Sequence, residues 1–209
     1  RLLHCLLMLG FSVSEGCRDK RPVALFAGAD LALSRNLGVK DKATIDDPRL
    51  DEMRMLRPYE IQRYVADGLF DLGIAGRDWI EETASDVVSL GELMYSKVSA
   101  RPVRIGLGVA DDAPWQRTGD LPQGVRVATE YVGLTQRFLS AKGVQAQVQH
   151  SHGATEAKVP DIVDAVVELT ETGSALRAAG LKIIDELLVS HTELMPNKEA
   201  DADPVTADR

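Results

Sequence analysis

Short hydrophobic runs alternate with helical patterns along most of this chain. Runs of the first kind are typical of buried strands, whereas apolar positions that recur every three to four residues indicate amphipathic helices. Alternation of the two predicts an α/β protein with mainly parallel sheets. The strands are expected at residues 53–56, 69–75, 87–90, 103–109, 125–128, 144–148 and 162–169, and the helices at 58–65, 78–83 and 134–141, while 181–189 fits either class.

Proline and glycine mark several of the predicted boundaries. Pro58 suits the first turn of a helix, and Gly68 is placed to end that helix. Gly73 lies inside the strand predicted at 69–75, where the missing side chain allows another element to approach closely.

The order of elements predicts two lobes with a cleft between them. We expect lobe I, on the nucleotide side, at residues 1–97 plus 178–209, and lobe II at residues 98–177. In α/β folds the ligand lies outside the carboxyl ends of the strands, and we expect it there.

Three segments fit the alternation less well. Residues 2–9 have helical spacing up to Gly10, with no strand before them. Residues 17–42 show no clean period, and the polar tail at 197–209 predicts disorder.

The composition narrows the classes of function. The 209 residues, 44% of them hydrophobic, suffice for one large core or two small ones. A net charge of −8 argues against a general nucleic-acid or membrane binder, but a small anion needs only a local site. Cys5 and Cys17 are too few for a disulfide framework, and neither a signal peptide nor a membrane span is evident. These features predict a cytoplasmic protein.

Residues 161–180 carry the clearest chemistry. Gly173 would let the backbone approach an anion, and the hydroxyls of Thr172 and Ser174 can donate to phosphate oxygens. Asp164 and Glu168 would lie beside this loop and hold ribose hydroxyls, directly or through Mg²⁺. A simple helix N-cap explains Thr-Gly-Ser equally well.

The segment DIVDAVVELTETGSALRAAGLKIID resembles the phosphoribosyl pyrophosphate loop of ATP phosphoribosyltransferases. Three further stretches match that family in the same order, and together the resemblance covers residues 44–198. These stretches are residues 44–82, 125–139 and 152–173.

The resemblance implies two α/β lobes around a cleft, as in periplasmic binding proteins. It also implies Mg²⁺, held through the substrate pyrophosphate, with Asp164 and Glu168 as candidate ligands. The implied donor-binding residues are Asp164, Glu168, Glu171, Thr172, Gly173, Ser174, Ala175 and Leu176, and the implied ATP-binding residues are Asp71, Gly76, Glu130 and Thr135.

The resemblance further implies the reaction that opens histidine biosynthesis. Adenine N1 of ATP attacks C1′ of phosphoribosyl pyrophosphate, and pyrophosphate leaves. No general base is required, so catalysis would depend on positioning and electrostatics. Arg57, Arg77 and Arg101 are candidate phosphate contacts.

The chain departs from the family pattern at three places. The first strand and its basic loop have no counterpart, residues 17–42 look inserted, and Ala175 stands where the loop commonly has a hydroxyl. No histidine-binding regulatory domain follows residue 198, which fits a short form or a truncated long form. The partner would accordingly be a second copy or a histidyl-tRNA synthetase-like subunit. Two alternatives stay open, a non-catalytic two-lobed binding module and an inactive fragment of the enzyme.

Overall fold

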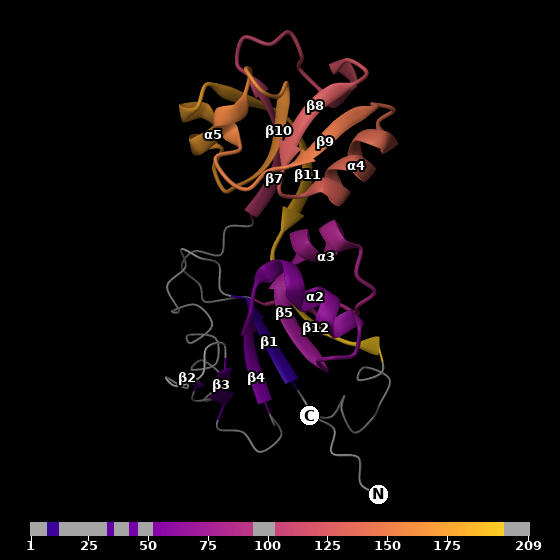
Figure 1. Ribbon diagram of the computed structural model, residues 1–209, viewed down its shortest axis with the longest axis vertical. Helices are drawn as coiled ribbons and strands as arrows, with labels where there is room; N and C mark the ends of the chain where they lie inside the picture. The colour runs from indigo at the N-terminus through magenta and orange to yellow at the C-terminus, as the bar shows by residue number, and fades with distance from the viewer. Residues whose placement is uncertain (1–7, 13–32, 36–41, 46–51, 94–102, 199–209) are drawn as a thin grey trace, which may run out of the picture. The chain divides into compact units, whose positions relative to one another are not determined.

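The computed structural model describes residues 8–12, 33–35, 42–45, 52–93 and 103–198, and the chain divides into two compact units (Figure 1). Unit 1 comprises Arg1–Ala100 and His191–Arg209, and unit 2 comprises Arg101–Ser190. An α/β fold in two parts was predicted. The chain crosses from unit 1 to unit 2 between residues 100 and 101 and returns to unit 1 between residues 190 and 191. The second crossing is later than the predicted 177/178, because the strand at 181–190 pairs within unit 2.

Unit 1 contains a mixed sheet with the order β2-β3-β4-β1-β5-β12-β6. The central strand β1 pairs in parallel with β4 on one side and β5 on the other, whereas the other pairs are antiparallel. The strands are β1 (Met8–Ser12), β2 (Leu33–Arg35), β3 (Lys42–Ile45), β4 (Glu52–Leu56), β5 (Leu72–Gly76), β6 (Gly91–Glu92) and β12 (Thr192–Pro196).

Helices α2 (Pro58–Ala66) and α3 (Arg77–Thr83) pack against β5. The bounds of α2 agree with those predicted from Pro58 and Gly68. Pro58 occupies the first turn of α2, and Gly68 follows it with a φ of +71°. A methyl group on Gly73 would lie 2.7 Å from Val65 Cγ2, so the helix rests directly on the strand backbone. The core of unit 1 consists of Ile61, Val65, Phe70, Ala75, Ile80 and Met195.

The N-terminal expectation is corrected by β1. A helix was predicted at residues 2–9, but residues 8–12 form a strand, because the position between β4 and β5 gives this apolar segment two ladders of hydrogen bonds. The sequence suggested that a central strand is missing from this sheet. In the structure β1 fills the position between β4 and β5, so β5 has a strand on both sides. Residues 1–7 and most of the segment at 17–42 lie outside the described residues.

Unit 2 contains a five-stranded sheet with the order β11-β7-β10-β8-β9. Strands β10, β8 and β9 are parallel, whereas β7 and β11 run antiparallel to their neighbours. The strands are β7 (Val103–Ala110), β8 (Val125–Thr129), β9 (Ala146–His150), β10 (Ala165–Thr170) and β11 (Leu181–Ser190), joined by helices α4 (Val132–Ala141) and α5 (Ser174–Ala178) and the 3-10 turns η1 (Thr118–Asp120) and η2 (Glu156–Lys158).

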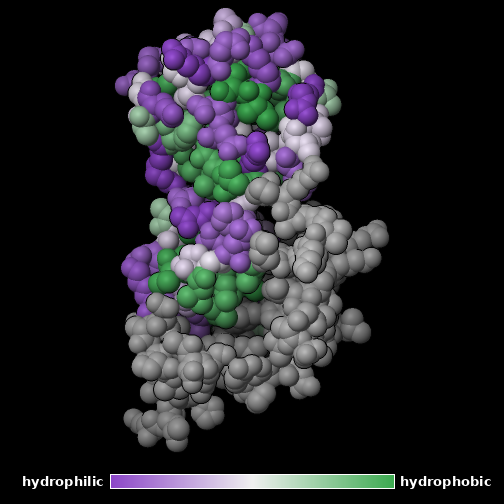
Figure 2. Space-filling view, turned by 180° about the vertical axis from the view of Figure 1, so that it is seen from behind, coloured by the Kyte–Doolittle hydropathy of each residue, from purple (hydrophilic) through white to green (hydrophobic). Residues whose placement is uncertain are grey.

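A separate core stabilises unit 2. It consists of Ala128, Val163, Val166, Leu176 and Leu181. Hydrophobic side chains also reach the surface of this unit, in the upper part of Figure 2, and the exposed ones include Ile162, Leu169, Ile183 and Val189. None of the described helices is long and apolar enough to cross a membrane.

Three further expectations about elements differ from the structure. The sheets are mixed rather than mainly parallel. Antiparallel strands flank the parallel centre of the sheet in unit 1, and two antiparallel strands lie on one side of the parallel strands in unit 2. Residues 87–90 form no strand, although Leu90 N–H donates to Leu194 O at 3.0 Å beside the short β6. The predicted tail also begins too early, because Asn197 is buried and its Nδ2 donates to Phe70 O at 3.1 Å.

Candidate functional site

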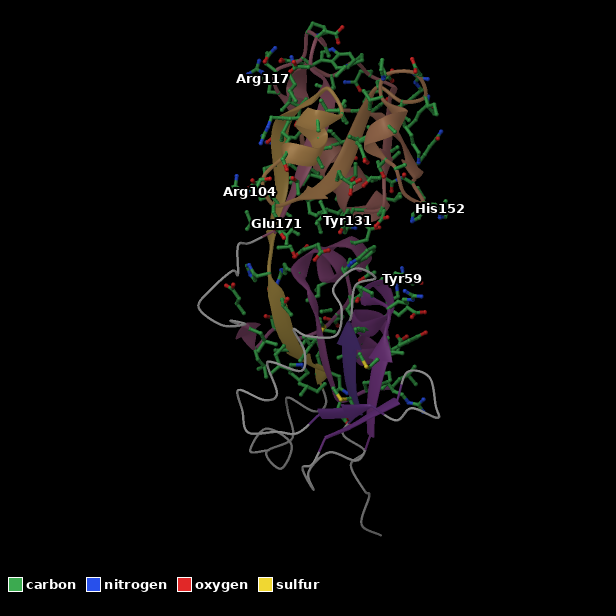
Figure 3. The ribbon with its side chains drawn as sticks, turned by 90° about the vertical axis from the view of Figure 1, so that its left-hand side faces the viewer. Tyr59, Arg104, Arg117, Tyr131, His152 and Glu171 are labelled. Atoms are coloured by element: carbon green, nitrogen blue, oxygen red, sulfur yellow. The ribbon has the colours of Figure 1, made fainter. Side chains whose placement is uncertain are left out.

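The carboxyl ends of the three parallel strands β8, β9 and β10 lie at one edge of unit 2. Thr129 pairs with His150 on one side and with Val167 on the other. The residues that follow these positions therefore come together at this edge, which is where α/β folds bind ligands. Figure 3 shows Tyr131, His152 and Glu171 along the same edge of the unit.

The loop after β10 has the tight turn that the sequence predicted. Gly173 has a φ of +71°, a conformation that favours glycine, and its N–H donates to Thr170 Oγ1 at 2.7 Å. Arg177 Nη2 donates to Thr172 O at 2.8 Å, and the Thr172 hydroxyl donates to Ser174 Oγ at 2.9 Å. These bonds fix the loop from within and leave Thr172 and Ser174 exposed.

Two details of the loop modify the prediction. The N-cap of α5 is Gly173, which has no side-chain cap, and its N–H already binds Thr170, so it is not directed at an anion. Leu176 is buried in the core, so its side chain supports the loop from beneath. The exposed positions that can meet a phosphate are Glu171, Thr172, Ser174 and Ala175, of which the two hydroxyls are donors.

Glu168 lies on β10 beside this loop and is half-buried. Its pKa is raised, chiefly because burial disfavours the charged carboxylate, and Glu130 and Glu156 add to the effect. Hydrogen bonds from the Thr155 side chain and the Leu169 N–H act in the opposite direction. The carboxylate is thus surrounded by both acidic groups and hydrogen-bond donors.

A buried hydroxyl pair adjoins Glu168, and sequence reasoning missed it. Ser151 Oγ and Thr155 Oγ1 are 2.8 Å apart, and Lys158 Nζ donates to Ser151 Oγ at 2.5 Å. Ser151 follows β9 directly, so its position at a strand end was the available signal. The histidines beside it, His150 and His152, are in contact, with ring centroids 4.5 Å apart and ring planes tilted by 57°.

Asp164 does not join Glu168, contrary to the expectation from sequence. It precedes β10, so it lies about 13 Å from Glu168 along the strand. Its carboxylate receives Arg126 Nη2 at 2.6 Å, Nε at 3.1 Å and the Arg126 N–H at 2.9 Å. The Arg126 guanidinium lowers the pKa of Asp164, so this carboxylate is charged and saturated by a structural partner.

The residues predicted for ATP are divided between the units. Asp71 precedes β5 and Gly76 ends it, so they lie at opposite ends of that strand in unit 1. Glu130 and Thr135 belong to unit 2, Glu130 at the edge beside Glu168 and Thr135 within α4. Thr135 is fully buried, and its Oγ1 has no hydrogen-bond partner among the described residues.

The three candidate arginines differ in their surroundings. Arg77 pairs with Glu81, and its Nη1 lies 3.5 Å from Oε2 of the buried Glu193. Arg57 is exposed at the start of α2, and Arg101 lies outside the described residues. Arg77 therefore has a structural role at the junction of β5, α3 and β12.

The edge of unit 2 that carries Glu130, Glu156 and Glu168 does not form a complete metal-binding site among the described residues. Within the described part of the chain, no three histidine, cysteine or carboxylate residues are grouped as such a site would require. Asp164 and Glu168 cannot share one ion, because they lie at different ends of β10. Glu130 is close enough to Glu168 for the two carboxylates to repel each other at this edge.

Comparison with known proteins gives a consistent result. Residues 57–207 match the family described as "HisG: ATP phosphoribosyltransferase". The chain is similar to the ATP phosphoribosyltransferase of Desulforudis audaxviator, with 45% identity over 95% of this chain and 68% of that protein. It is likewise similar to that of Nitratidesulfovibrio vulgaris strain DP4, with 50% identity over 77% of this chain and 54% of that protein. The chain thus spans between about half and two thirds of these relatives' lengths.

Solved structures support the fold. The ATP phosphoribosyl transferase (HisG:HisZ) complex from Thermotoga maritima contains a chain similar to this one, with a TM-score of 0.79, 21% identity and coverage of 97% of this chain and 93% of that one. The alkanesulfonate-binding protein SsuA from Xanthomonas axonopodis has a TM-score of 0.54 and 18% identity over 97% of this chain and 69% of its own. These similarities confirm the predicted relation to periplasmic binding proteins at the level of fold.

Proposed function

Because this chain belongs to the ATP phosphoribosyltransferase family, we propose that it joins ATP to phosphoribosyl pyrophosphate as a transferase of histidine biosynthesis. The observation that carries the proposal is the loop after β10, in which Gly173 turns the chain and exposes the Thr172 and Ser174 hydroxyls beside Glu168. A compact anion and the hydroxyls of an attached sugar match this pairing of donors with an acceptor.

In this proposal the loop holds the 5′-phosphate of the donor. Ser174 donates to its oxygens, Thr172 does so once its hydroxyl turns away from Ser174 Oγ, and Glu168 accepts from the ribose hydroxyls. Ala175 offers no hydroxyl, and the loss of one hydrogen bond to a charged group weakens binding by about 1.5–3 kcal/mol. Glu171 and Leu176 complete the loop by their backbone, whereas Asp164 supports β10 through Arg126.

The reaction replaces one bond at C1′ with another. Adenine N1 supplies the electron pair for the new bond, and the bond from C1′ to the pyrophosphate oxygen breaks with its electrons leaving on pyrophosphate. The chain contributes position and charge rather than a proton acceptor. Glu168 and Glu130 can stabilise positive charge developing on the ribose ring. Mg²⁺ bound to the pyrophosphate would supply neutralising charge, and Glu168 and Glu130 would be the carboxylates able to hold it.

The nucleotide and the partners are part of the same proposal. Of the predicted ATP contacts, Gly76 at the carboxyl end of β5 and Glu130 at that of β8 are retained in this proposal, whereas Asp71 lies at the other end of β5 and Thr135 is buried. The similar complex from Thermotoga maritima pairs HisG with HisZ, which favours a hetero-oligomer with a HisZ-like subunit, and a homo-oligomer is the alternative. A cytoplasmic location stays a prediction.

The deciding experiment measures pyrophosphate release by the purified chain. ATP, phosphoribosyl pyrophosphate and Mg²⁺ are supplied together and then with each substrate omitted in turn. Release that requires both substrates is the expected result. If a cooperatively folded chain releases none, alone or with a HisZ-like subunit added, the transferase proposal fails and the non-catalytic binding module takes its place.

A further inference from the structure

Arg177 lies against the loop after β10, although the sequence did not predict it as part of the donor site. Its Nη2 donates to Thr172 O at 2.8 Å. Its Nη1 is so near the backbone of Gly173 that a Cβ added to this glycine would be only 2.9 Å from it. The guanidinium therefore lies along residues 172 and 173, in the loop that exposes the hydroxyls of Thr172 and Ser174.

The local backbone explains this position. Arg177 lies in α5, where its N–H donates to Gly173 O at 3.0 Å. Helical side chains lean toward the N-terminus of their helix, so the guanidinium reaches back to the loop. The missing side chain at Gly173 leaves the space that the guanidinium occupies.

The guanidinium keeps most of its donors and all of its charge in this position. It has five N–H groups, of which one donates to Thr172 O. Among the described residues it has no other hydrogen-bond partner and no carboxylate in ion-pair contact. A carbonyl oxygen accepts a hydrogen bond but does not neutralise a positive charge, and the Arg177 side chain is exposed.

A phosphate at this edge requires such a charge. Glu168 lies on β10 beside the loop, and Glu171 is exposed within it. A phosphate monoester is close to doubly negative at neutral pH, so these carboxylates would repel it. The hydroxyls of Thr172 and Ser174 can donate hydrogen bonds, but they carry no charge to offset this repulsion.

Two other cations near this edge already have polar partners. Arg104 lies opposite Thr170, the last residue of β10, and its Nη1 is 3.4 Å from Oε2 of Glu186. Lys158 Nζ donates to the buried hydroxyl of Ser151. Of these three cations, Arg177 alone contacts the loop itself through a recorded hydrogen bond.

We propose that Arg177 binds the 5′-phosphate of the donor and makes the loop selective for a doubly charged phosphate ester. Nη2 stays on Thr172 O, and the remaining N–H groups of the guanidinium donate to phosphate oxygens. The inference rests on the proposed function, in which this loop holds the 5′-phosphate. Arg177 touches no reacting atom, so its effect is on binding of the donor.

The test measures binding by calorimetry, without turnover. The ligands are ribose 5-phosphate and ribose 5-sulfate, which share a tetrahedral anionic group but differ by one charge near neutral pH. Arg177→Gln keeps a hydrogen-bond donor and removes the charge. It should weaken ribose 5-phosphate binding about tenfold or more, as for the loss of a hydrogen bond between charged groups, and weaken ribose 5-sulfate binding by a smaller factor.

A second variant tests the charge directly. Arg177→Lys keeps the positive charge but loses the planar fork, so it should recover part of the affinity for ribose 5-phosphate. If Arg177 only fixes the loop through Thr172 O, its replacement disturbs the site for both ligands alike. Equal factors for the two ligands, or no recovery with lysine, would therefore overturn the inference.

The matched control is Arg117→Gln, which removes the same charge from the same unit. Arg117 is exposed and pairs with Asp120, its Nε 3.0 Å from Oδ1. Figure 3 shows Arg117 and Glu171 at opposite ends of unit 2. This variant should leave the affinity for both ligands unchanged, and a tenfold loss here would show that net charge alone explains the effect of Arg177→Gln.

The binding assay separates failure of this inference from failure of the proposed function. Unchanged affinity for ribose 5-phosphate in Arg177→Gln overturns the inference even if the wild-type chain releases pyrophosphate. A tenfold loss in a chain whose wild type releases no pyrophosphate supports the role of Arg177 and refutes the transferase. A wild-type chain that binds neither ligand overturns the inference, whatever the pyrophosphate assay gives.

Discussion

At the scale of single residues, both the backbone conformation and the space around position 173 favour glycine. Its φ of +71° is rarely adopted by residues with a side chain. A Cβ at this position would also lie 2.9 Å from Arg177 Nη1 and 3.1 Å from Ile183 Cδ1. Since Arg177 donates to Thr172 O, a side chain at 173 would push away the group that fixes the loop.

We predict that Gly173→Val abolishes measurable binding of phosphoribosyl pyrophosphate in calorimetry. Gly180→Val is the matched control, because Gly180 has a similar φ of +76° but open space around its Cβ position. Both variants should lose about 1–2 kcal/mol or more of stability from the backbone conformation. Donor affinity should fall only in the first, and equal affinity in the two variants would contradict a binding role for this loop.

The sequence allowed only part of this site to be predicted. The turn at Gly173 follows from local spacing, so it was predicted correctly, and Glu168 lies on the strand before it, while its role in binding stays a prediction. Asp164 was placed beside them wrongly, because its four-residue spacing from Glu168 suggests proximity, whereas an extended strand separates the two. Ser151, Thr155 and Lys158 were missed, since their hydrogen bonds depend on how the loop after β9 folds back on itself.

At the scale of elements, the contact between α2 and β5 depends on Gly73. The strand backbone lies close enough that an added methyl group would be 2.7 Å from Val65 Cγ2 and 2.9 Å from Ile61 Cγ2. Both of these branched side chains are fully buried and have little room to move. The sequence predicted a close approach at Gly73, and the packing confirms it.

We predict that Gly73→Ala lowers the free energy of unfolding by about 1–3 kcal/mol, as overpacking of a tight core does. Urea denaturation measures the change. Adding Val65→Ala to this variant should recover part of the loss, because it removes the methyl groups that clash. Gly119→Ala, with open space at its Cβ position, serves as the control. A loss in the control as large as that in Gly73→Ala would exclude the steric explanation.

At the scale of the whole molecule, the two units have separate cores. Leu181 begins β11 and belongs to the core of unit 2, whereas Met195 in β12 belongs to that of unit 1. These residues are close in sequence, yet the crossing at 190/191 separates them. The position of the crossing therefore decides which unit each one stabilises.

We predict that Leu181→Ala and Met195→Ala destabilise different units, each by about 2–5 kcal/mol for a buried large side chain. Hydrogen exchange read by mass spectrometry should rise in β7 and β10 for the first variant and in β5 for the second. If Leu181→Ala instead speeds exchange in β5, the strand at 181–190 contributes to unit 1, as the sequence first suggested.

The sequence by itself determined the α/β class, most helices and strands of residues 52–198, and the turn at Gly173, because these follow from periodicity and from glycine and proline over a few neighbouring residues. The tertiary structure alone decided that residues 8–12 form a central strand, that β11 joins unit 2, and that Arg126 binds Asp164. Each of these depends on hydrogen bonds between segments far apart in the chain. Local periodicity contains no information about which distant strand completes a sheet.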